Sequence, residues 1–320
     1  MERAHVFDAV AARWTDGEGL SEAPRPATRE ELLRVHTAEH VDAIARTSGR
    51  AVMLDPDTFT SPESAEIAAL AAGAAVQAVD HAIDRKDAAF ALVRPPGHHA
   101  ERDRAMGFCL FNNIAVAAAH AQSRGLARVA VVDIDVHHGN GTQWIFYDNP
   151  RVLYVSTHQY PFYPGTGAAN EVGTGEGRGF TFNVPLEMGA TDADYALVYR
   201  EAAIPVLHEF APDVVLVSAG FDAHERDPLA SMRVTTEGYA WVVRQLVDAS
   251  TNGSIAFVTE GGYDLGALSD CLDAAIAEAS GTASRLGGSA SRSTEPSSTA
   301  RAARALDTVR AAQKGFWHNL

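Results

Sequence analysis

The sequence has little cysteine: Cys109 and Cys271 are the only two among 320 residues, far apart and outside any Cys-x-x-Cys pattern. Two such cysteines exclude a disulfide framework and also a zinc site built from thiolates. The low count is typical of a protein that works in a reducing compartment.

Long apolar runs are also missing. The most apolar stretch, 65–79, is interrupted by a glutamate, a glycine and a glutamine, and is shorter than a membrane-spanning helix. The first twenty residues carry six charged side chains, which leaves no apolar core for a signal peptide. We therefore expect a soluble, cytoplasmic protein without a membrane partner.

Positive charge is scarce. The chain has 26 basic and 41 acidic residues, a formal net charge of −15, so its surface repels nucleic acid. The end of the chain differs from the rest. We expect 281–300 to be a flexible loop rich in serine and glycine, and 301–317 to be a basic C-terminal helix. Opposite charge favours docking of this helix on the acidic body over a free solvated tail.

What the sequence does contain is an alternation of short apolar runs with helical patterns. The predicted strands are 90–93, 129–136, 152–157, 180–184, 214–218 and 255–259. The predicted helices are 64–84, 112–123, 192–210, 236–249 and 268–279. Buried strands separated by segments of helix length indicate a mainly parallel sheet with helices on both faces.

Polar residues gather where four of these strands stop. The runs RPPGHH, DIDVHHGN, SAGFD and TEGGY each lie at the end of an apolar segment. Ligand sites of such sheets lie beyond the carboxyl ends of the strands. The four runs are therefore expected to meet in one pocket.

Asp135, His137 and Asp222 are the candidate metal ligands. A pleated strand would send Asp135 and His137 to the same face, and Asp222 follows another strand. Two carboxylates and one imidazole suit a borderline divalent ion with open positions. The alternative is an ion pair at a strand end, with Asp222 as a turn or capping residue.

The tandem histidines His98 and His99 are candidates for proton transfer beside such a metal. Asp133 and Asn140 are placed to orient one imidazole each. Tyr263 follows two glycines, where its phenol can stabilise an oxyanion. The competing interpretations are a solvated histidine loop and a tyrosine at the edge of the core.

Five longer motifs support this interpretation: RPPGHHAERDRAMGFCLFNN, VVDIDVHHGNGTQ, PFYPGTGAANEVGTGEGRGF, SAGFDAHERDPLA and EGGYDLGAL. They resemble the histone deacetylase superfamily, specifically its class II branch and the bacterial histone-deacetylase-like amidohydrolases. The resemblance covers roughly 25–280. It implies one catalytic domain over 1–320, with a three-layer α/β/α arginase/deacetylase fold around a mainly parallel eight-stranded sheet.

The resemblance also implies residue roles. Asp135, His137 and Asp222 would hold Zn²⁺, with Fe²⁺ as the other candidate, and Asp133, Asp135, His137 and Ser156 would hold a structural K⁺, partly through main-chain oxygens. His99 would be the general base and then the general acid, His98 would act through its charge beside Asp133, and Asn140 would support His99. The substrate site would comprise Phe108, Tyr163, Gly107, Leu229 and, at the rim, Asp57. Core packing is the alternative explanation for Phe108.

The implied activity is removal of acetyl groups from lysine side chains of a protein or peptide. A polyamine deacetylase is one rival, but polyamine-selective relatives carry glutamate where Leu229 follows Asp227-Pro228. A two-manganese ureohydrolase needs bridging carboxylates that the motif Asp133-x-Asp135-x-His137 does not supply. A protein that binds acyl ligands without turnover is the non-enzymatic rival. The motifs leave both a monomer and a homo-oligomer open.

One departure from the family pattern lies at the N-terminus. Members usually begin with a strand and a loop of the Gly-His-Pro-Glu-Arg type that forms part of the pocket rim. Here Met1 stands about where that loop ends. We expect this chain to lack the first strand: either translation begins upstream of Met1, or one wall of the pocket is missing or replaced.

Overall fold

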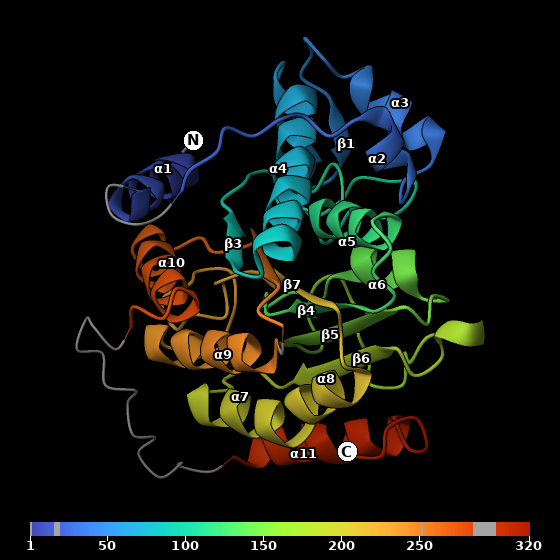
Figure 1. Cartoon of the computed structure of the whole chain (residues 1–320), viewed down its shortest axis with the longest axis vertical. Coiled ribbons are helices and arrows are strands. Elements are labelled where there is room, and N and C mark those ends of the chain that lie inside the picture. Colours follow the sequence, from blue (N-terminus) through green and yellow to red (C-terminus); the bar gives the residue numbers. More distant parts are fainter. Residues whose placement is uncertain (1, 16–19, 251, 284–298) are drawn as a thin grey trace.

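The centre of the molecule is a parallel sheet of six strands, in the order β3-β8-β7-β4-β5-β6, seen in a computed structural model (Figure 1). The structure describes residues 2–15, 20–250, 252–283 and 299–320. The strands are β3 (Ala88–Ala91), β4 (Val129–Asp133), β5 (Val152–Gln159), β6 (Thr181–Leu186), β7 (Val214–Ala219) and β8 (Ile255–Thr259). Each predicted strand is present.

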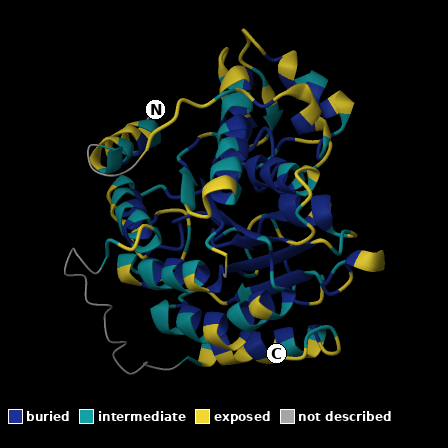
Figure 2. Cartoon of the chain, viewed as in Figure 1, coloured by how far each residue is buried: buried dark blue, intermediate teal, exposed yellow. Residues whose placement is uncertain are grey.

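Helices cover both faces of the sheet, which explains why its strands are apolar on both sides (Figure 1). Along β4, Val129 and Val131 pack toward the helices of one layer, whereas Ala130 and Val132 pack toward the other. One layer contains α4 (Ser64–Arg85), α5 (Asn113–Ser123) and α6 (Asn140–Phe146). The other contains α7 (Asp192–Val198), α8 (Ile204–Phe210), α9 (Thr236–Ala249) and α10 (Leu265–Ala279). Figure 2 shows the sheet buried between the two layers. The predicted α/β/α architecture is confirmed.

The predicted helix over 192–210 is interrupted in the middle. A π-helical turn, η2 (Tyr199–Ala203), joins α7 to α8. Pro205 stands in the first turn of α8 and has no N–H to donate, so the regular hydrogen-bond ladder cannot run through it. The interruption therefore follows from one proline.

The implied number of eight strands in one sheet is wrong for the described residues. The two further strands, β1 (Met53–Asp55) and β2 (Thr58–Phe59), form a separate antiparallel hairpin. They are three and two residues long, and they pair with each other. This hairpin is followed by α4, and its turn carries Asp57 to the site described below.

The N-terminal segment is a helix, α1 (Glu2–Thr15), which packs against α10 (Figure 1). No strand precedes β1 in the described residues. Two shorter helices, α2 (Arg29–Leu33) and α3 (Ala38–Ala45), follow before the hairpin. Among the described helices, none has both the length and the apolar character of a membrane span.

The C-terminal helix α11 (Ala300–Ala312) packs on α7 and β6. Its side chains pair with acidic residues of the body, Arg304 with Glu187 and Arg310 with Glu201. Charge complementarity thus accompanies the apolar contacts of this helix. Most of the expected 281–300 loop lies outside the described residues. A 3-10 turn, η1 (Gly175–Gly177), lies between β5 and β6.

Candidate metal centre and active site

The carboxyl ends of the strands surround a pocket of about 230 Å³. Most side chains proposed from the sequence line it: Asp57, His98, His99, Gly107, Phe108, Asp135, His137, Tyr163, Leu229 and Tyr263. Pro96, Phe162 and Gly261 complete the lining. Asp222, Asp133 and Asn140 lie behind these residues in direct contact with them.

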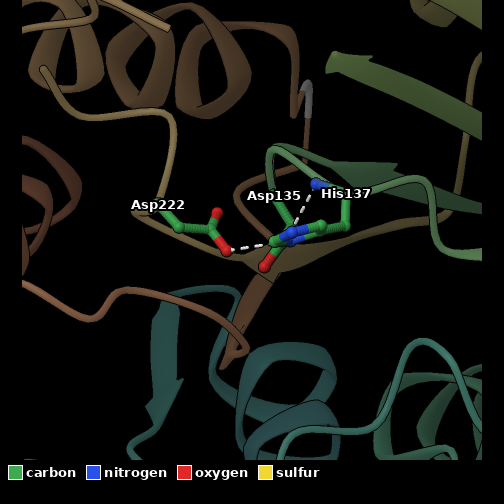
Figure 3. A group of neighbouring side chains, drawn as sticks. All are labelled: Asp135, His137 and Asp222. Carbon is green, nitrogen blue, oxygen red and sulfur yellow. Dashed lines mark hydrogen bonds and ion pairs between the residues drawn. The ribbon is translucent and has the colours of Figure 1, made fainter. Parts of the chain in front are cut away.

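The structure brings the three candidate metal ligands together (Figure 3), with Asp135 and His137 in the pocket lining and Asp222 directly behind them. One ligand atom from each of Asp135, His137 and Asp222 lies within 4.8 Å of the other two. Nδ1 of His137 lies 3.1 Å from Oδ1 of Asp135 and 3.2 Å from Oδ2 of Asp222. One nitrogen and two carboxylate groups therefore face a common point.

The chain leaves β4 before it reaches these ligands. The strand ends at Asp133, four residues before His137, so alternation along a strand does not bring Asp135 and His137 together. Instead, the backbone N–H of His137 donates to Oδ1 of Asp135 over 2.8 Å. A turn closed by the ligand's own carboxylate replaces the expected strand geometry.

Neighbouring backbone holds the two carboxylates in place. Gly261 N–H donates to Oδ2 of Asp135 over 2.8 Å, and Val136 N–H donates to Oδ1 of Asp222 over 2.9 Å. A Cβ atom at Gly261 would collide with the Asp222 carboxylate, so only glycine lets the backbone come this close. The site is shaped to hold two buried carboxylates side by side.

The electrostatics of this group favour a cation. Burial disfavours the charged imidazole, but hydrogen bonds to Asp135 and Asp222 outweigh it and raise the pKa of His137 to about 10. Burial and the charge of Asp135 raise the pKa of Asp222 to about 6. The carboxylates thus hold a proton where a divalent cation would also be bound, and the donor set suits such an ion.

The tandem histidines have different partners. Nδ1 of His98 lies 3.0 Å from Oδ2 of Asp133, whereas Nδ1 of His99 lies 2.8 Å from Oδ1 of Asn140. The amide of Asn140 is oriented by its Nδ2, which donates to Oε1 of Glu101 over 2.7 Å. Its oxygen therefore accepts from His99, and Nε2 of that imidazole is left with a free lone pair.

These partners set opposite charge states. Burial lowers the pKa of His98, but the charges of Asp133 and Asp135 outweigh burial and raise it well above its usual value. Burial and the charge of His98 together hold the pKa of His99 well below its usual value. At neutral pH the pair consists of one imidazolium and one neutral imidazole, which can accept a proton.

Tyr263 lines the same pocket. Burial, with added effect from Asp222, raises the pKa of its phenol far above the usual range, so the hydroxyl stays protonated and able to donate. The guanidinium of Arg3, on α1, lies 5.4 Å from the centre of the Tyr263 ring. A residue of the N-terminal helix α1 therefore lies beside Tyr263.

Aromatic side chains form the upper walls. Phe108 and Tyr163 are 43% and 37% exposed, as expected of residues at a pocket mouth rather than in the core. The Tyr163 ring meets His99 edge-on, with 5.2 Å between ring centres. Asp57 accepts from the backbone N–H of Gly107 over 3.1 Å, and Leu229 stands at the rim, 46% exposed.

Gly107 is required by its surroundings. Its φ of +57° is in the left-handed region, and a Cβ atom there would collide with the ring of His99. The loop that carries Phe108 therefore packs directly against the candidate base. No side chain separates the pocket wall from the imidazole.

Asp133 and Ser156, expected as potassium ligands, are partners on adjacent strands β4 and β5 and are both fully buried. Asp133 accepts from the phenol of Tyr154 over 3.1 Å, and Ser156 hydrogen-bonds His158. Potassium at Asp133, Asp135, His137 and Ser156 stays a prediction.

Sequence reasoning missed several residues of the site. Phe162 stacks on the His137 ring with 5.3 Å between the ring centres. It was not proposed as a site residue, although it belongs to the motif PFYPGTGAANEVGTGEGRGF. Asp227 accepts from the backbone N–H groups of Tyr263 and Leu229 over 2.7 and 3.0 Å. Glu260 and Arg3 also lie behind the pocket. Glu260 directly follows the apolar strand β8, and this position at a strand end is the sequence signal that indicates a site residue.

Fold and site together describe a buried candidate metal site at the carboxyl edge of a parallel α/β sheet. The sequence profile of the histone deacetylase domain matches residues 2–279. The chain belongs to the histone deacetylase family.

Relatives from several kingdoms match. Histone deacetylase 15 of Arabidopsis thaliana is 45% identical over 86% of this chain and 50% of its own length. A probable deacetylase of Archaeoglobus fulgidus is 42% identical over 77% of this chain and 70% of its own. Polyamine deacetylase HDAC10 of Homo sapiens is 38% identical over 98% of this chain and 48% of its own. The chain thus spans about half the length of the plant and human relatives.

A solved structure has the same fold. The crystal structure of the HDA15 HD domain superimposes with a TM-score of 0.89 and 40% sequence identity, covering 98% of this chain and 89% of that chain. The match includes the sheet and both helix layers, which confirms the fold that the motifs implied.

Proposed function

We propose that this chain is a metal-dependent amidohydrolase that removes acetyl groups from lysine side chains of polypeptides. The observation that carries the proposal is the arrangement of the histidine pair beside the three candidate metal ligands. Nδ1 of His98 faces the carboxylate of Asp133 and Nδ1 of His99 faces the amide oxygen of Asn140, in the pocket where a triad suited to a divalent cation comes together. Deacetylase relatives at 38–45% identity support removal of acetyl groups, and one of them, a polyamine deacetylase, keeps the acetylpolyamine as the rival substrate.

Asp135, Nδ1 of His137 and Asp222 would hold the metal. Zinc is our proposal, with iron(II) as the alternative, because the set has one nitrogen and two oxygen donors and no thiolate. A bound divalent cation would polarise the acyl carbonyl and lower the pKa of a water molecule.

The chain's own residues supply the proton transfers. Because Nδ1 of His99 donates to Asn140, Nε2 is free to accept a proton from the attacking water. His98, held charged by Asp133, adds positive potential where negative charge develops on the acyl oxygen. The phenol of Tyr263 donates to that oxygen, and His99 returns its proton to the amine that leaves. Acetate and a free amine are the products.

The substrate class follows from the pocket mouth. The aromatic walls of Phe108, Phe162 and Tyr163 suit a narrow aliphatic stem, and Asp57 at the rim suits a hydrogen bond from a peptide backbone. Leu229 stands where polyamine-selective relatives carry glutamate, which favours acetyl-lysine over acetylpolyamine. The net charge of −15 attracts either cationic substrate.

The decisive experiment begins with protein stripped of metal by a chelator and reloaded with zinc or iron(II). Acetate release is then measured from an acetyl-lysine peptide and from a mono-acetylated diamine. We expect about one metal per chain and turnover that favours the peptide. Metal binding without acetate release would instead support a ligand-binding protein, and a preference for the diamine would support a polyamine deacetylase.

Two matched variants control this experiment. Asp222→Asn removes one candidate metal ligand, so we expect loss of both metal and turnover. Asp194→Asn alters a carboxylate that is equally buried but lies in the capping box of α7, away from the pocket. It should retain metal and turnover, even if its stability falls.

A further inference from the structure

Glu260 is a fully buried carboxylate behind the tandem histidines. Its Oε2 accepts from the backbone N–H of Gly97 over 2.6 Å and from that of His98 over 3.2 Å. Its Oε1 accepts from the hydroxyl of Ser218 over 3.2 Å. The carboxylate thus bridges the histidine turn on one side and strand β7 on the other.

The same stretch of chain also reaches the other parts of the site. Glu260 follows β8, and its own N–H donates to the carbonyl of Ala219 over 3.1 Å, so its backbone is fixed to β7. The next residue, Gly261, donates to Asp135, and Tyr263 comes two residues later. Four consecutive residues therefore contact the histidine turn and a candidate metal ligand, and carry the candidate oxyanion donor.

We propose that Glu260 is a positioning residue that fixes the tandem-histidine turn relative to the metal ligands, so that the imidazole of His99 is held at the reacting water. The inference rests on the proposed function for its catalytic part. Its structural part, the anchoring of the Gly97 and His98 amides, does not depend on turnover.

The physical basis of this positioning role is the free-energy cost of leaving buried backbone N–H groups without a hydrogen-bond acceptor. Gly97 and His98 are both buried, and Glu260 is their acceptor. Without that acceptor the two N–H groups would have to find other partners, and the turn would shift to provide them. A displacement of about 1 Å of a catalytic group costs about a hundredfold in rate.

Two single variants separate the effect of side-chain length at residue 260 from the effect of its negative charge. Glu260→Gln keeps the length of the side chain: its Oε1 can accept from both amides while its Nε2 donates to the hydroxyl of Ser218. Glu260→Asp keeps the charge but withdraws the carboxylate by one methylene. If position matters, Gln should work better than Asp; if the negative charge matters, Asp should work better than Gln.

The readouts are kcat and KM on the acetyl-lysine peptide with zinc-loaded protein, metal content, and amide hydrogen exchange of the 94–99 segment. For Glu260→Asp we expect kcat about a hundredfold lower with KM nearly unchanged, about one metal per chain and faster exchange of the segment. For Glu260→Gln we expect kcat within about fivefold of wild type and exchange near wild type. Asp194→Asn, the buried carboxylate of α7, should change neither kcat nor the exchange of this segment.

The opposite order, with Glu260→Asp more active than Glu260→Gln, would overturn the proposal, as would unchanged exchange of the 94–99 segment in both variants. Loss of metal in step with kcat would also overturn it, because Glu260 would then act on the metal site. If the wild-type chain itself releases no acetate, the proposed function fails, while the exchange of the segment still tests the anchoring role.

Discussion

His99 donates a hydrogen bond from Nδ1 to the amide oxygen of Asn140 over 2.8 Å, whereas its neighbour His98 is paired with a carboxylate. Burial and the charge of His98 hold the pKa of His99 well below its usual value, and the hydrogen bond to Asn140 opposes this shift. A neutral amide at residue 140 stabilises the imidazolium form of His99 less than a carboxylate would, so His99 can stay neutral and able to act as a base.

We expect Asn140→Asp to move the acidic limb of the pH profile of kcat/KM to higher pH. A carboxylate there would favour the imidazolium form of His99 and raise its pKa, and the imidazolium cannot accept a proton. Because Nδ2 of Asn140 also donates to Glu101, the new carboxylate would face a like charge. The double variant Asn140→Asp/Glu101→Gln restores that hydrogen bond and should show the shift without the repulsion. An unmoved acidic limb in both variants would show that His99 is not the base.

Tyr263→Phe should lower kcat by about a hundredfold or more, the scale of losing one oxyanion donor, while metal content stays at one per chain. Steady-state kinetics on an acetyl-lysine peptide measure the effect. Tyr160→Phe removes a hydroxyl outside the pocket lining and serves as the control. An unchanged kcat in Tyr263→Phe would remove this phenol from the mechanism.

Leu229→Glu should shift the preference toward an acetylated diamine. Leu229 is 46% exposed at the rim, so the new carboxylate would form a solvent-exposed ion pair with a cationic substrate. We expect about a fivefold change in the ratio of kcat/KM values, the scale of one such pair, and a smaller change at high salt. Leu229→Gln, which adds polarity without charge, should leave the ratio near wild type. An equal shift in both variants would mean that charge is not the cause.

Stability should fall as the pH falls from about 6.5 toward 3, in part through His36. Burial and the nearby His40 lower the pKa of His36 to about 3, from 6.5 in the unfolded chain. Its Nε2 accepts from the N–H of Asn112, and its Nδ1 donates to the carbonyl of Glu101, so the folded state requires the neutral ring.

Because the unfolded chain takes up this proton first, His36 lowers the free energy of unfolding by up to about 1.4 kcal/mol for each pH unit in that window. Urea unfolding at several pH values measures the slope. His36→Gln should reduce it, whereas His208→Gln, at an exposed position, should not. Equal slopes in wild type and His36→Gln would refute the assignment.

Much of the site could be predicted because its signals are local. Apolar strands that end in acidic or histidine residues place those side chains at one edge of a parallel sheet, as Asp222 and the tandem histidines show. Positions near strand ends indicated that Asp133 and Asn140 orient one imidazole each, whereas the pairing of His98 with Asp133 and of His99 with Asn140 was implied only by the family resemblance.

Other features depend on how distant segments meet, and no local pattern records that. Nothing in the sequence indicates that Glu260 accepts from the amides of Gly97 and His98, 162 or more residues away. The ring of Phe162 stacks on His137 only because two loops converge. The N-terminal segment forms a helix, and β1 and β2 pair with each other rather than with the main sheet. Tertiary packing decided these outcomes.

The direct contact between residue 107 and the His99 ring has a consequence for redesign of this pocket. Libraries that aim to widen the pocket have freedom at Phe108 and Leu229, which lie at its solvent-exposed mouth. They have none at Gly107, where even a methyl group would collide with the His99 ring. Altered selectivity is therefore most accessible at the mouth of the pocket, with Gly107 left unchanged.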